Sequence, residues 1–425
     1  MKFETLALHA GFDPKEHNNA GNPPIYQTTG YIYDSPQQAA KRFQLKEFGN
    51  IYTRITNPTT NILEKRIAAL EKGTAAIATA SGMSAQFLTI NSLTEKSDNI
   101  LASSYLYGGT FNQLKVTFKK LGVETKFFDI DDLNNIEKLA NKKTKAIYIE
   151  TIGNPSFAIP DFEKIVHIAK NLHIPVVVDN TFATPYLCNP IGYGVNIVVH
   201  SMTKYIGGHG ATMGGVIIDG GNFDWGKDDR FPGLTQPSES HNGIIFNDLF
   251  GKNSSNQNIA FAIKTLTDGM LDIGPTLSPI NSFLFLQSLE TLSLRMERYS
   301  ENTLKLAEYL SNHPKIQSVN YPGLKNSPYH NLAKKYLSKG QGGMMSIELK
   351  GVAESGKNFL QKVKLAFHES NLGDSKTIVT HPSSTTHQSL SSEEQKKCGI
   401  TPGLIRISVG LENIDDIIAD FEQAF

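Results

Sequence analysis

The sequence has few of the residues that cross-link a chain or bind a metal. Its only cysteines are Cys188 and Cys398, and it has neither a Cys-x-x-Cys motif nor a His/Cys cluster with metal-ligand spacing. A disulfide framework and a structural zinc site are therefore not indicated, and we expect no metal in the functional site. This sparse cysteine usage favours a reducing, cytoplasmic location.

Long apolar runs and an excess of one charge are also missing. No segment approaches about 18 consecutive apolar residues, and the opening MKFETLALHAGFD contains Glu4 and lacks the apolar stretch of a signal peptide. We therefore expect neither membrane insertion nor secretion. Because 41 Lys and Arg balance 41 Asp and Glu, no overall basic field exists to bind nucleic acid or an anionic membrane. Small-molecule substrates or protein partners are favoured instead.

Short apolar, β-branched runs alternate with helical patterns through the middle of the chain. The runs are 75–80, 99–101, 146–150, 175–179, 195–200 and 214–219. Runs that are apolar on both faces and separated by helices predict a mostly parallel sheet that is covered on each side, which is an α/β fold. One intervening helix is predicted after Asp161, an N-cap residue, and ends before Pro175.

The flanking segments divide the chain into three predicted parts. Residues 1–60 are rich in Gly, Pro, Asn, Gln and Tyr without a sustained helical period, so we expect an extended N-terminal arm. Residues 61–280 form the α/β domain, with a polar insert at 219–258 that holds the only tryptophan. Residues 281–425 open with one long helical pattern, continue with strand candidates and close with a helix capped by Asn413, which predicts a smaller α+β domain.

Lys204 is the sharpest candidate for chemistry. It lies in NIVVHSMTKYIGGHG, four residues beyond an apolar strand. A loop lysine that extends to water would explain it, and so would a Schiff-base lysine, whose desolvated amine attacks an aldehyde. Ser201 and Thr203 beside it could hold a phosphate. The glycines that follow are out of register for a G-x-G-x-x-G dinucleotide motif, which argues against a nicotinamide dehydrogenase.

Asp179 ends the strand PVVVD, at the edge of a parallel sheet where ligands bind. It could simply cap a turn. Together with Lys204, which follows the next strand, it suggests pyridoxal phosphate, because the pyridine nitrogen of that cofactor needs an anion to stay protonated.

Two further segments are compatible with the same cofactor. ASGMSAQF follows a strand and opens a helix, so Ser81, Gly82 and Met83 could present backbone N–H groups to a phosphate, although small residues start many helices. Tyr107 precedes a Gly-Gly turn, where an aromatic side chain could stack on a flat ring or could be an ordinary packed tyrosine.

Several motifs together resemble the pyridoxal-phosphate enzymes of cysteine and methionine metabolism. They are YTRITNPT, SGMSA, LYGGT, IETIGNP with Glu150 and Asn154, VVVDNTFATP, SMTKYIGGHG and HPSSTTH, and the likeness runs from about Thr5 to the C-terminus. It implies the type I, aspartate-aminotransferase-like fold, with residues 61–280 as the cofactor-binding domain. Within the family, the 219–258 insert and the overall length resemble the O-acetylhomoserine sulfhydrylases.

The resemblance also implies roles for individual residues. Lys204 would carry the cofactor, Asp179 would contact its ring nitrogen, Tyr107 would stack on its ring, and Asn154 would contact its hydroxyl side. The phosphate would be held by Ser81, Gly82, Met83, Ser201 and Thr203, and by Tyr52 and Arg54 of a neighbouring subunit. Arg406, helped by Asn371, would bind the substrate's α-carboxylate.

Arg406 can also be interpreted without the family. It alternates with Ile405 and Ile407, so it faces away from the apolar side of its strand, where a guanidinium suits a carboxylate. A solvated strand arginine is the other interpretation.

The implied reaction is γ-replacement on an activated homoserine. O-acetyl-L-homoserine and sulfide would give L-homocysteine and acetate, or methionine if methanethiol replaces sulfide. The alternatives are a cystathionine γ-synthase, a methionine or cystathionine γ-lyase, and a binding or scaffold protein on an inherited fold. We expect a homo-oligomer whose dimers share active sites, because an arm without its own fold would bind a neighbour. Two such dimers would pair to form a tetramer.

Overall fold

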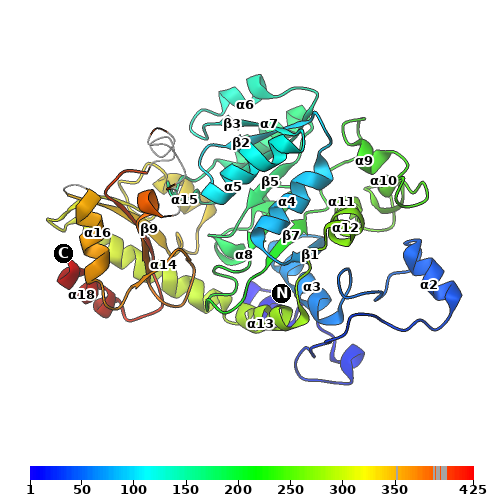
Figure 1. Cartoon of the computed structure of the whole chain (residues 1–425), viewed down its shortest axis with the longest axis horizontal. Helices are drawn as coiled ribbons and strands as arrows, with labels where there is room; N and C mark the ends of the chain where they lie inside the picture. Colours follow the sequence, from blue (N-terminus) through cyan, green and yellow to red (C-terminus); the bar gives the residue numbers. More distant parts are fainter. Residues whose placement is uncertain (351–352, 386–387, 389–392, 394–399) are drawn as a thin grey trace.

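A large sheet forms the centre of the computed structural model (Figure 1), which describes residues 1–350, 353–385, 388, 393 and 400–425. In this part of the chain its seven strands lie in the order β1-β7-β6-β5-β4-β2-β3. They are β1 (Ala75–Thr79), β2 (Asn99–Ser103), β3 (Glu124–Phe128), β4 (Thr144–Glu150), β5 (Val176–Asp179), β6 (Ile197–Ser201) and β7 (Gly215–Asp219).

The sheet is mostly parallel, which confirms the predicted fold class. Strands β2 to β6 pair in parallel, whereas β7 runs antiparallel to both β1 and β6. The expectation that the 214–219 run is another parallel strand is therefore wrong. Its connection from β6, residues 202–214, contains no helix that would return the chain across the sheet, and an unbridged return places the next strand antiparallel.

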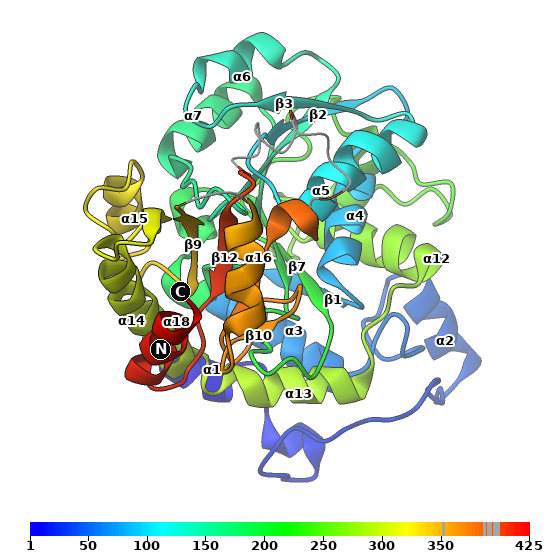
Figure 2. The same ribbon diagram turned by 60° about the vertical axis from the view of Figure 1, so that its left-hand side comes forward.

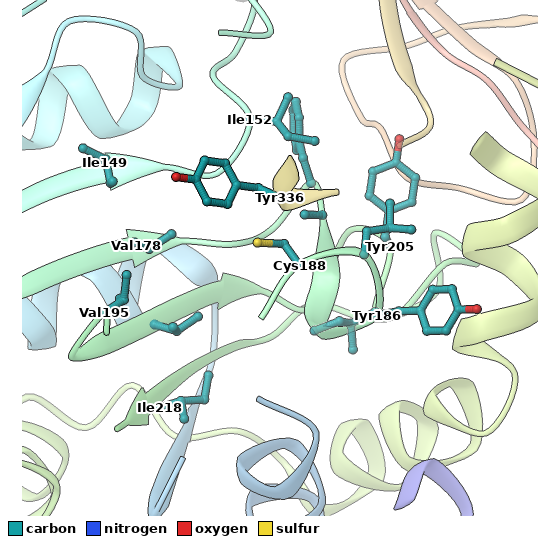
Figure 3. Close-up of a cluster of buried hydrophobic side chains, with 14 of the residues drawn as sticks. Ile149, Ile152, Val178, Tyr186, Cys188, Val195, Tyr205, Ile218 and Tyr336 are labelled. Carbon is teal, nitrogen blue, oxygen red and sulfur yellow. The ribbon is translucent and has the colours of Figure 1, made fainter. Parts of the chain in front are cut away.

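Helices cover both faces of the large sheet. On one face α3 (Pro58–Glu71), α7 (Phe162–Leu172) and α8 (Thr184–Leu187) pack on strand residues such as Ile149, Val178 and Ile218, part of which Figure 3 shows. On the other face lie α4 (Gly82–Leu93), α5 (Gly108–Asn112), η2 (Gln113–Phe118), α11 (Ala260–Lys264) and η4 (Thr265–Met270). The remaining elements of this part are α6 (Asn134–Leu139), η3 (Pro190–Tyr193), α9 (Pro232–Thr235), α10 (Phe246–Phe250) and α12 (Leu271–Ile273). The Asp161 side chain caps α7, as predicted.

A second sheet lies toward the C-terminus (Figure 2). Its order is β10-β11-β12-β9-β8, from β8 (Ile316–Asn320), β9 (Met344–Leu349), β10 (Phe367–His368), β11 (Ile378–Thr380) and β12 (Leu404–Ser408). Helices α15 (His330–Tyr336), α16 (Ala353–Lys362) and α18 (Ile414–Ala424) accompany it, with η5 (Pro382–Ser384). Asn413 caps α18, as predicted. The short strands β10 and β11 carry too few residues for a readable pattern.

The long helical pattern after residue 280 is two helices, not one. α13 (Pro279–Leu289) and α14 (Leu292–Ser311) are separated at Glu290 and Thr291. The apolar face nevertheless continues across this break, because Leu286, Leu289, Leu292 and Met296 are all buried. A break between two buried stretches leaves the apolar period almost undisturbed, so the sequence does not reveal it.

The N-terminal arm is not wholly extended. It contains α1 (Phe3–His9), η1 (Pro14–His17) and α2 (Pro36–Phe43), and both views show α2 at the periphery of the molecule (Figures 1 and 2). No residue of α2 is buried, so this helix has no apolar face against the protein's own core. Its start is set locally by the Ser35 cap and by Pro36 at the first helical position.

The 219–258 insert packs onto the large domain through aromatic side chains. Trp225 is buried, with ring centroids 4.6 Å from Phe223, 5.1 Å from Phe231 and 5.7 Å from Phe261. The insert also meets the arm, where the Phe48 and Phe250 ring centroids are 6.2 Å apart. It therefore extends the core beside the sheet.

Two features of composition can be placed in the fold. Cys188 is buried and unpaired, and Cys398 lies outside the described residues. None of the helices in the described part of the chain combines the length and the hydropathy needed to cross a bilayer.

Candidate active site

A cavity of about 1040 Å³ opens at the carboxyl ends of the parallel strands, between the large sheet and the C-terminal part of the chain. Nearly all of the residues predicted for the site line it: Ser81, Gly82, Met83, Tyr107, Asn154, Asp179, Ser201, Thr203, Lys204, Asn371 and Arg406. The edge of the sheet collects them because parallel strands end on the same side.

One end of the cavity is built to hold an anion. Ser81 is the N-cap of the 12-residue helix α4, and its Oγ accepts a hydrogen bond from the Ser84 backbone at 3.1 Å. Ser201, at the end of β6, closes against Gly82, where an added Cβ would lie 2.6 Å from the Ser201 Cβ. A glycine is needed at this approach. Unpaired N–H groups of a helix start beside serine hydroxyls suit a phosphate.

Two buried carboxylates line the same cavity. Asp179 Oδ1 accepts hydrogen bonds from the Thr181 backbone at 2.9 Å and the Thr181 hydroxyl at 2.5 Å. Glu150, paired with Asp179 across the strands, accepts one from the Tyr107 backbone N–H at 2.7 Å. Burial raises the pKa of Asp179, and burial with the nearby Asp179 charge raises the pKa of Glu150 further. Two desolvated carboxylates in one cavity favour a cationic or N–H ligand.

Lys204 reaches the cavity from the loop after β6. Its Nζ donates a hydrogen bond to Asn371 Oδ1 at 2.6 Å, so the two residues meet across 167 positions of sequence. Burial, with the Arg406 charge as a second cause, lowers the pKa of Lys204 to about 8. A substantial fraction of the amine is then neutral near physiological pH, which a nucleophile or base requires.

Arg406 is buried at the centre of strand β12. Only 2% of it is exposed, so the alternative of a solvated strand arginine is wrong. Its Nη2 donates to the carbonyl oxygens of Ser370 at 3.4 Å and Asn371 at 3.3 Å. It forms no ion pair with any residue that the structure describes, and burial lowers its pKa to about 10. A desolvated guanidinium without a counter-ion is suited to a ligand carboxylate.

The structure does not bring Tyr52 and Arg54 into the cavity of their own chain. Tyr52 is 44% exposed, and the Arg54 guanidinium carbon lies 5.5 Å from the centroid of the Tyr52 ring. These two predicted site residues therefore stand apart from the others.

Other lining residues were not predicted for the site. They include Glu150, Gln86, Thr110, Ile152, Thr181, Phe182, Thr212, Met213 and Thr385. Glu150 could have been found, since it ends an apolar strand as Asp179 does. The last two residues of the HPSSTTH motif, at 386 and 387, lie outside the described residues.

The residues present fit pyridoxal phosphate. The amide oxygen of Asn154 is buried in the cavity wall without a hydrogen-bond partner in the described chain, as expected if it receives a ligand hydroxyl. The anion cup, the two carboxylates and the desolvated lysine supply partners for the phosphate, the ring nitrogen and the aldehyde. The fold and the site define a pyridoxal-phosphate-dependent enzyme.

Comparison with known proteins also identifies a pyridoxal-phosphate-dependent enzyme. The model of the Cys/Met metabolism PLP-dependent enzyme family matches residues 4–425, and the chain belongs to this family. It is 49% identical to the O-acetyl-L-homoserine sulfhydrylase of Leptospira meyeri, over 100% of this chain and 96% of that protein. It is 51% identical to the homocysteine/cysteine synthase of Kluyveromyces lactis, over 100% of this chain and 97% of that protein.

A solved structure has the same architecture. It is a Campylobacter jejuni protein assigned as an O-acetylhomoserine (thiol)-lyase, with an N'-pyridoxyl-lysine-5'-monophosphate in its chain. The two structures match with a TM-score of 0.96 at 42% identity, over 100% of this chain and 99% of that one. The sequence-based recognition of the family and of its cofactor is confirmed.

Proposed function

We propose that this chain catalyses γ-replacement on an acylated homoserine: O-acetyl-L-homoserine and sulfide give L-homocysteine and acetate, and methanethiol in place of sulfide gives L-methionine. The Cγ–O bond of the ester breaks, a Cγ–S bond forms, and the proton of the thiol leaves with the acetate. The observation that carries the proposal is that one cavity holds both the desolvated Lys204 amine and the Arg406 guanidinium, which has no carboxylate partner among the described residues.

The proposed cofactor contacts follow the cavity wall. Asp179 binds the ring nitrogen, Tyr107 stacks on the ring, and Asn154 receives the ring hydroxyl through its unpartnered amide oxygen. The phosphate is held by Ser81, Gly82, Met83, Ser201 and Thr203. Glu150 adds a contact outside this set: by accepting the Tyr107 backbone N–H it fixes the start of the segment that carries the stacking ring.

The substrate is held by its carboxylate. Arg406, fixed by the backbone carbonyls of Ser370 and Asn371, presents its free N–H groups to the α-carboxylate. The Asn371 amide, which binds Lys204 Nζ in this structure, is placed to contact the same end of the substrate. The α-carbon is thereby directed toward Lys204.

The bound pyridoxal phosphate supplies an electron sink for the negative charge that develops when protons leave the substrate. Lys204 Nζ takes the proton from Cα and returns a proton later in the reaction. Its pKa of about 8 lets it work in both directions near neutral pH. Asp179, buried and held by Thr181, would offer its carboxylate to the ring nitrogen of the cofactor.

A matrix of substrates tests this function. O-acetyl-, O-succinyl- and O-phosphohomoserine and O-acetylserine are each combined with sulfide, methanethiol, cysteine and no thiol, and the products are identified. Homocysteine from O-acetylhomoserine and sulfide as the fastest reaction supports the proposal. Fastest turnover with cysteine would instead indicate a cystathionine γ-synthase, and fastest turnover without any thiol a γ-lyase. The O-acetylserine arm is included because one relative is a homocysteine/cysteine synthase.

We propose that two chains share each active site. Ile32, Phe43 and Phe48 of the N-terminal arm are 98%, 65% and 62% exposed, which is apolar surface suited to burial against a second copy. In that arrangement Tyr52 and Arg54 would complete the phosphate cup of the neighbour. We propose that each chain consists of an arm at 1–60, a cofactor domain at 61–280 and a C-terminal domain at 281–425. We also propose that two of these dimers form a homotetramer and that the protein is cytoplasmic.

Complementation tests the shared site. Arg54→Ala and Lys204→Ala are each expected to be inactive, but in a mixed dimer one site carries both defects and the other neither. Refolding them together should therefore restore activity, to at most about half of the sites in each heterodimer. Heterodimers that form but stay inactive would place Arg54 in its own chain's site. Sedimentation of the wild-type protein distinguishes the tetramer from the dimer.

A further inference from the structure

A second cluster of polar side chains lies behind the cavity, on the opposite face of the large sheet. Its members are Glu71 at the end of α3, Thr151, Asn180 and His200, and each is at most 1% exposed. None of them lines the cavity. They lie among the apolar side chains of this face, where Figure 3 shows Cys188, whose carbonyl oxygen accepts a hydrogen bond from Asn180 Nδ2 at 3.1 Å.

Each strand-end member of this cluster is the chain neighbour of a cavity residue. Thr151 follows Glu150, Asn180 follows Asp179, and His200 precedes Ser201. Successive residues of a strand point to opposite faces, so the cavity residues face forward and their neighbours face back. The strand register aligns Glu150 with Asp179 and Asp179 with Val199, which places 151, 180 and 200 in one row across three adjacent strands.

One carboxylate ties this row together. Glu71 Oε1 accepts hydrogen bonds from His200 Nε2 at 2.6 Å and from Asn180 Nδ2 at 2.8 Å. Asn180 Oδ1 in turn accepts one from the Thr151 hydroxyl at 2.7 Å. Glu71 Oε2 accepts a further bond from Asn189 Nδ2 at 3.2 Å. The ends of β4, β5 and β6 are therefore linked through side chains as well as through the backbone ladder.

Burying this polar cluster costs folding free energy, which suggests that it has a role other than stabilising the core. A buried carboxylate and imidazole lose their hydration, and apolar residues of similar volume often stabilise a core equally well. The Glu71 bond is the only hydrogen bond of the His200 ring in the described chain, since His200 Nδ1 has no partner there. Glu71 thus sets the orientation of His200.

We propose that Glu71 and His200 are positioning residues of the cofactor site, which act through Asn180 and Thr151 to hold Glu150, Asp179 and Ser201 at the spacing that the cofactor requires. The inference rests on the proposed cofactor contacts of Asp179 and Ser201. A cluster that served the core alone would affect the stability of the fold. A positioning cluster also affects the affinity for pyridoxal phosphate, because the ring and phosphate contacts are on adjacent strands.

The test compares cofactor affinity with stability. Pyridoxal phosphate release from the purified holoenzyme is measured as a dissociation constant, and the denaturation midpoint of the cofactor-free protein is measured separately. The variants are Glu71→Gln and the milder, nearly isosteric Thr151→Val. The matched control is Asp420→Asn in α18, a buried carboxylate away from the cavity that accepts hydrogen bonds from the backbone of Lys364 at 2.7 Å and Ala366 at 3.0 Å.

Both cluster variants should weaken cofactor binding by about tenfold or more, the size of effect that residues supporting a site commonly have. Asp420→Asn should lower the midpoint and leave the dissociation constant unchanged. The proposal is overturned if Thr151→Val, and Glu71→Gln where it folds, bind the cofactor as tightly as the wild type. Ser201→Ala distinguishes a failure of the positioning role from a failure of the proposed phosphate contact. If Ser201→Ala also leaves the affinity for pyridoxal phosphate unchanged, Ser201 does not hold the phosphate, and the positioning role that rests on this contact is refuted as well.

Discussion

Replacing Lys204 with methionine should stabilise the cofactor-free protein at neutral pH, although it removes the residue that we assign to catalysis. Burial lowers the pKa of Lys204 from 10.5 to about 8, so the charged amine is less favourable in the folded chain than in the unfolded chain. Since one pKa unit corresponds to about 1.4 kcal/mol, the folded state loses about 3 kcal/mol at pH 7. Lys204→Met removes this cost.

The sign of the pH dependence is fixed by which state holds the proton. Between pH 8 and 10.5 the unfolded chain binds the proton more tightly than the folded chain, so the stability of the wild type rises with pH in that interval. By pH 9.5 the cost of burying Lys204 should have fallen to about 1.4 kcal/mol. The advantage of Lys204→Met should shrink by about 2 kcal/mol between pH 7 and pH 9.5.

The assay is denaturant unfolding of cofactor-free protein at both pH values and at one fixed protein concentration. Losing the Lys204 hydrogen bond to Asn371 offsets about 1 kcal/mol, which leaves a net gain of about 2 kcal/mol at pH 7 and little at pH 9.5. Lys142→Met at an exposed position is the matched control and should show no such pH-dependent gain. A Lys204→Met gain that is the same at both pH values, or a loss at pH 7, would refute the reasoning.

Three further substitutions probe the cavity. Asp179→Asn should keep the fold but lower kcat at least a hundredfold, because an oriented charge is commonly worth about 3 kcal/mol in the transition state; a variant with a tenth of wild-type kcat would contradict its role. Gly82→Ala should weaken pyridoxal phosphate binding by about tenfold, as the new methyl group meets Ser201, whereas unchanged affinity in a cofactor titration would remove Gly82 from the phosphate cup. Arg406→Lys should raise KM for the acylated homoserine by about tenfold or more with a smaller change in kcat, since one ammonium replaces a guanidinium fork; an unchanged KM in steady-state assays would argue against carboxylate binding.

Local sequence patterns were enough to locate most of the cavity wall. Asp179 and Lys204 were singled out because each follows an apolar strand, and parallel strands bring such positions to one edge. The same logic applies to Glu150, which ends β4 opposite Asp179 but was not assigned to the site. The direction of β7 was missed, because apolar runs look alike in parallel and antiparallel strands when both faces are covered.

Periodicity and nearby side chains predicted strands such as β5 and β6 and the helix caps at Asp161 and Asn413, because these features depend on residues a few positions apart. The same patterns did not predict strand β3 or helix α2. How distant groups meet depends on the packing of segments that are far apart in the chain. Alternation showed which way Arg406 faces but not that other parts of the chain cover it, and no local pattern joins Lys204 to Asn371 or Glu71 to His200. Desolvation and pairing create the reactivity of these groups, and both depend on contacts between segments that are remote in the chain.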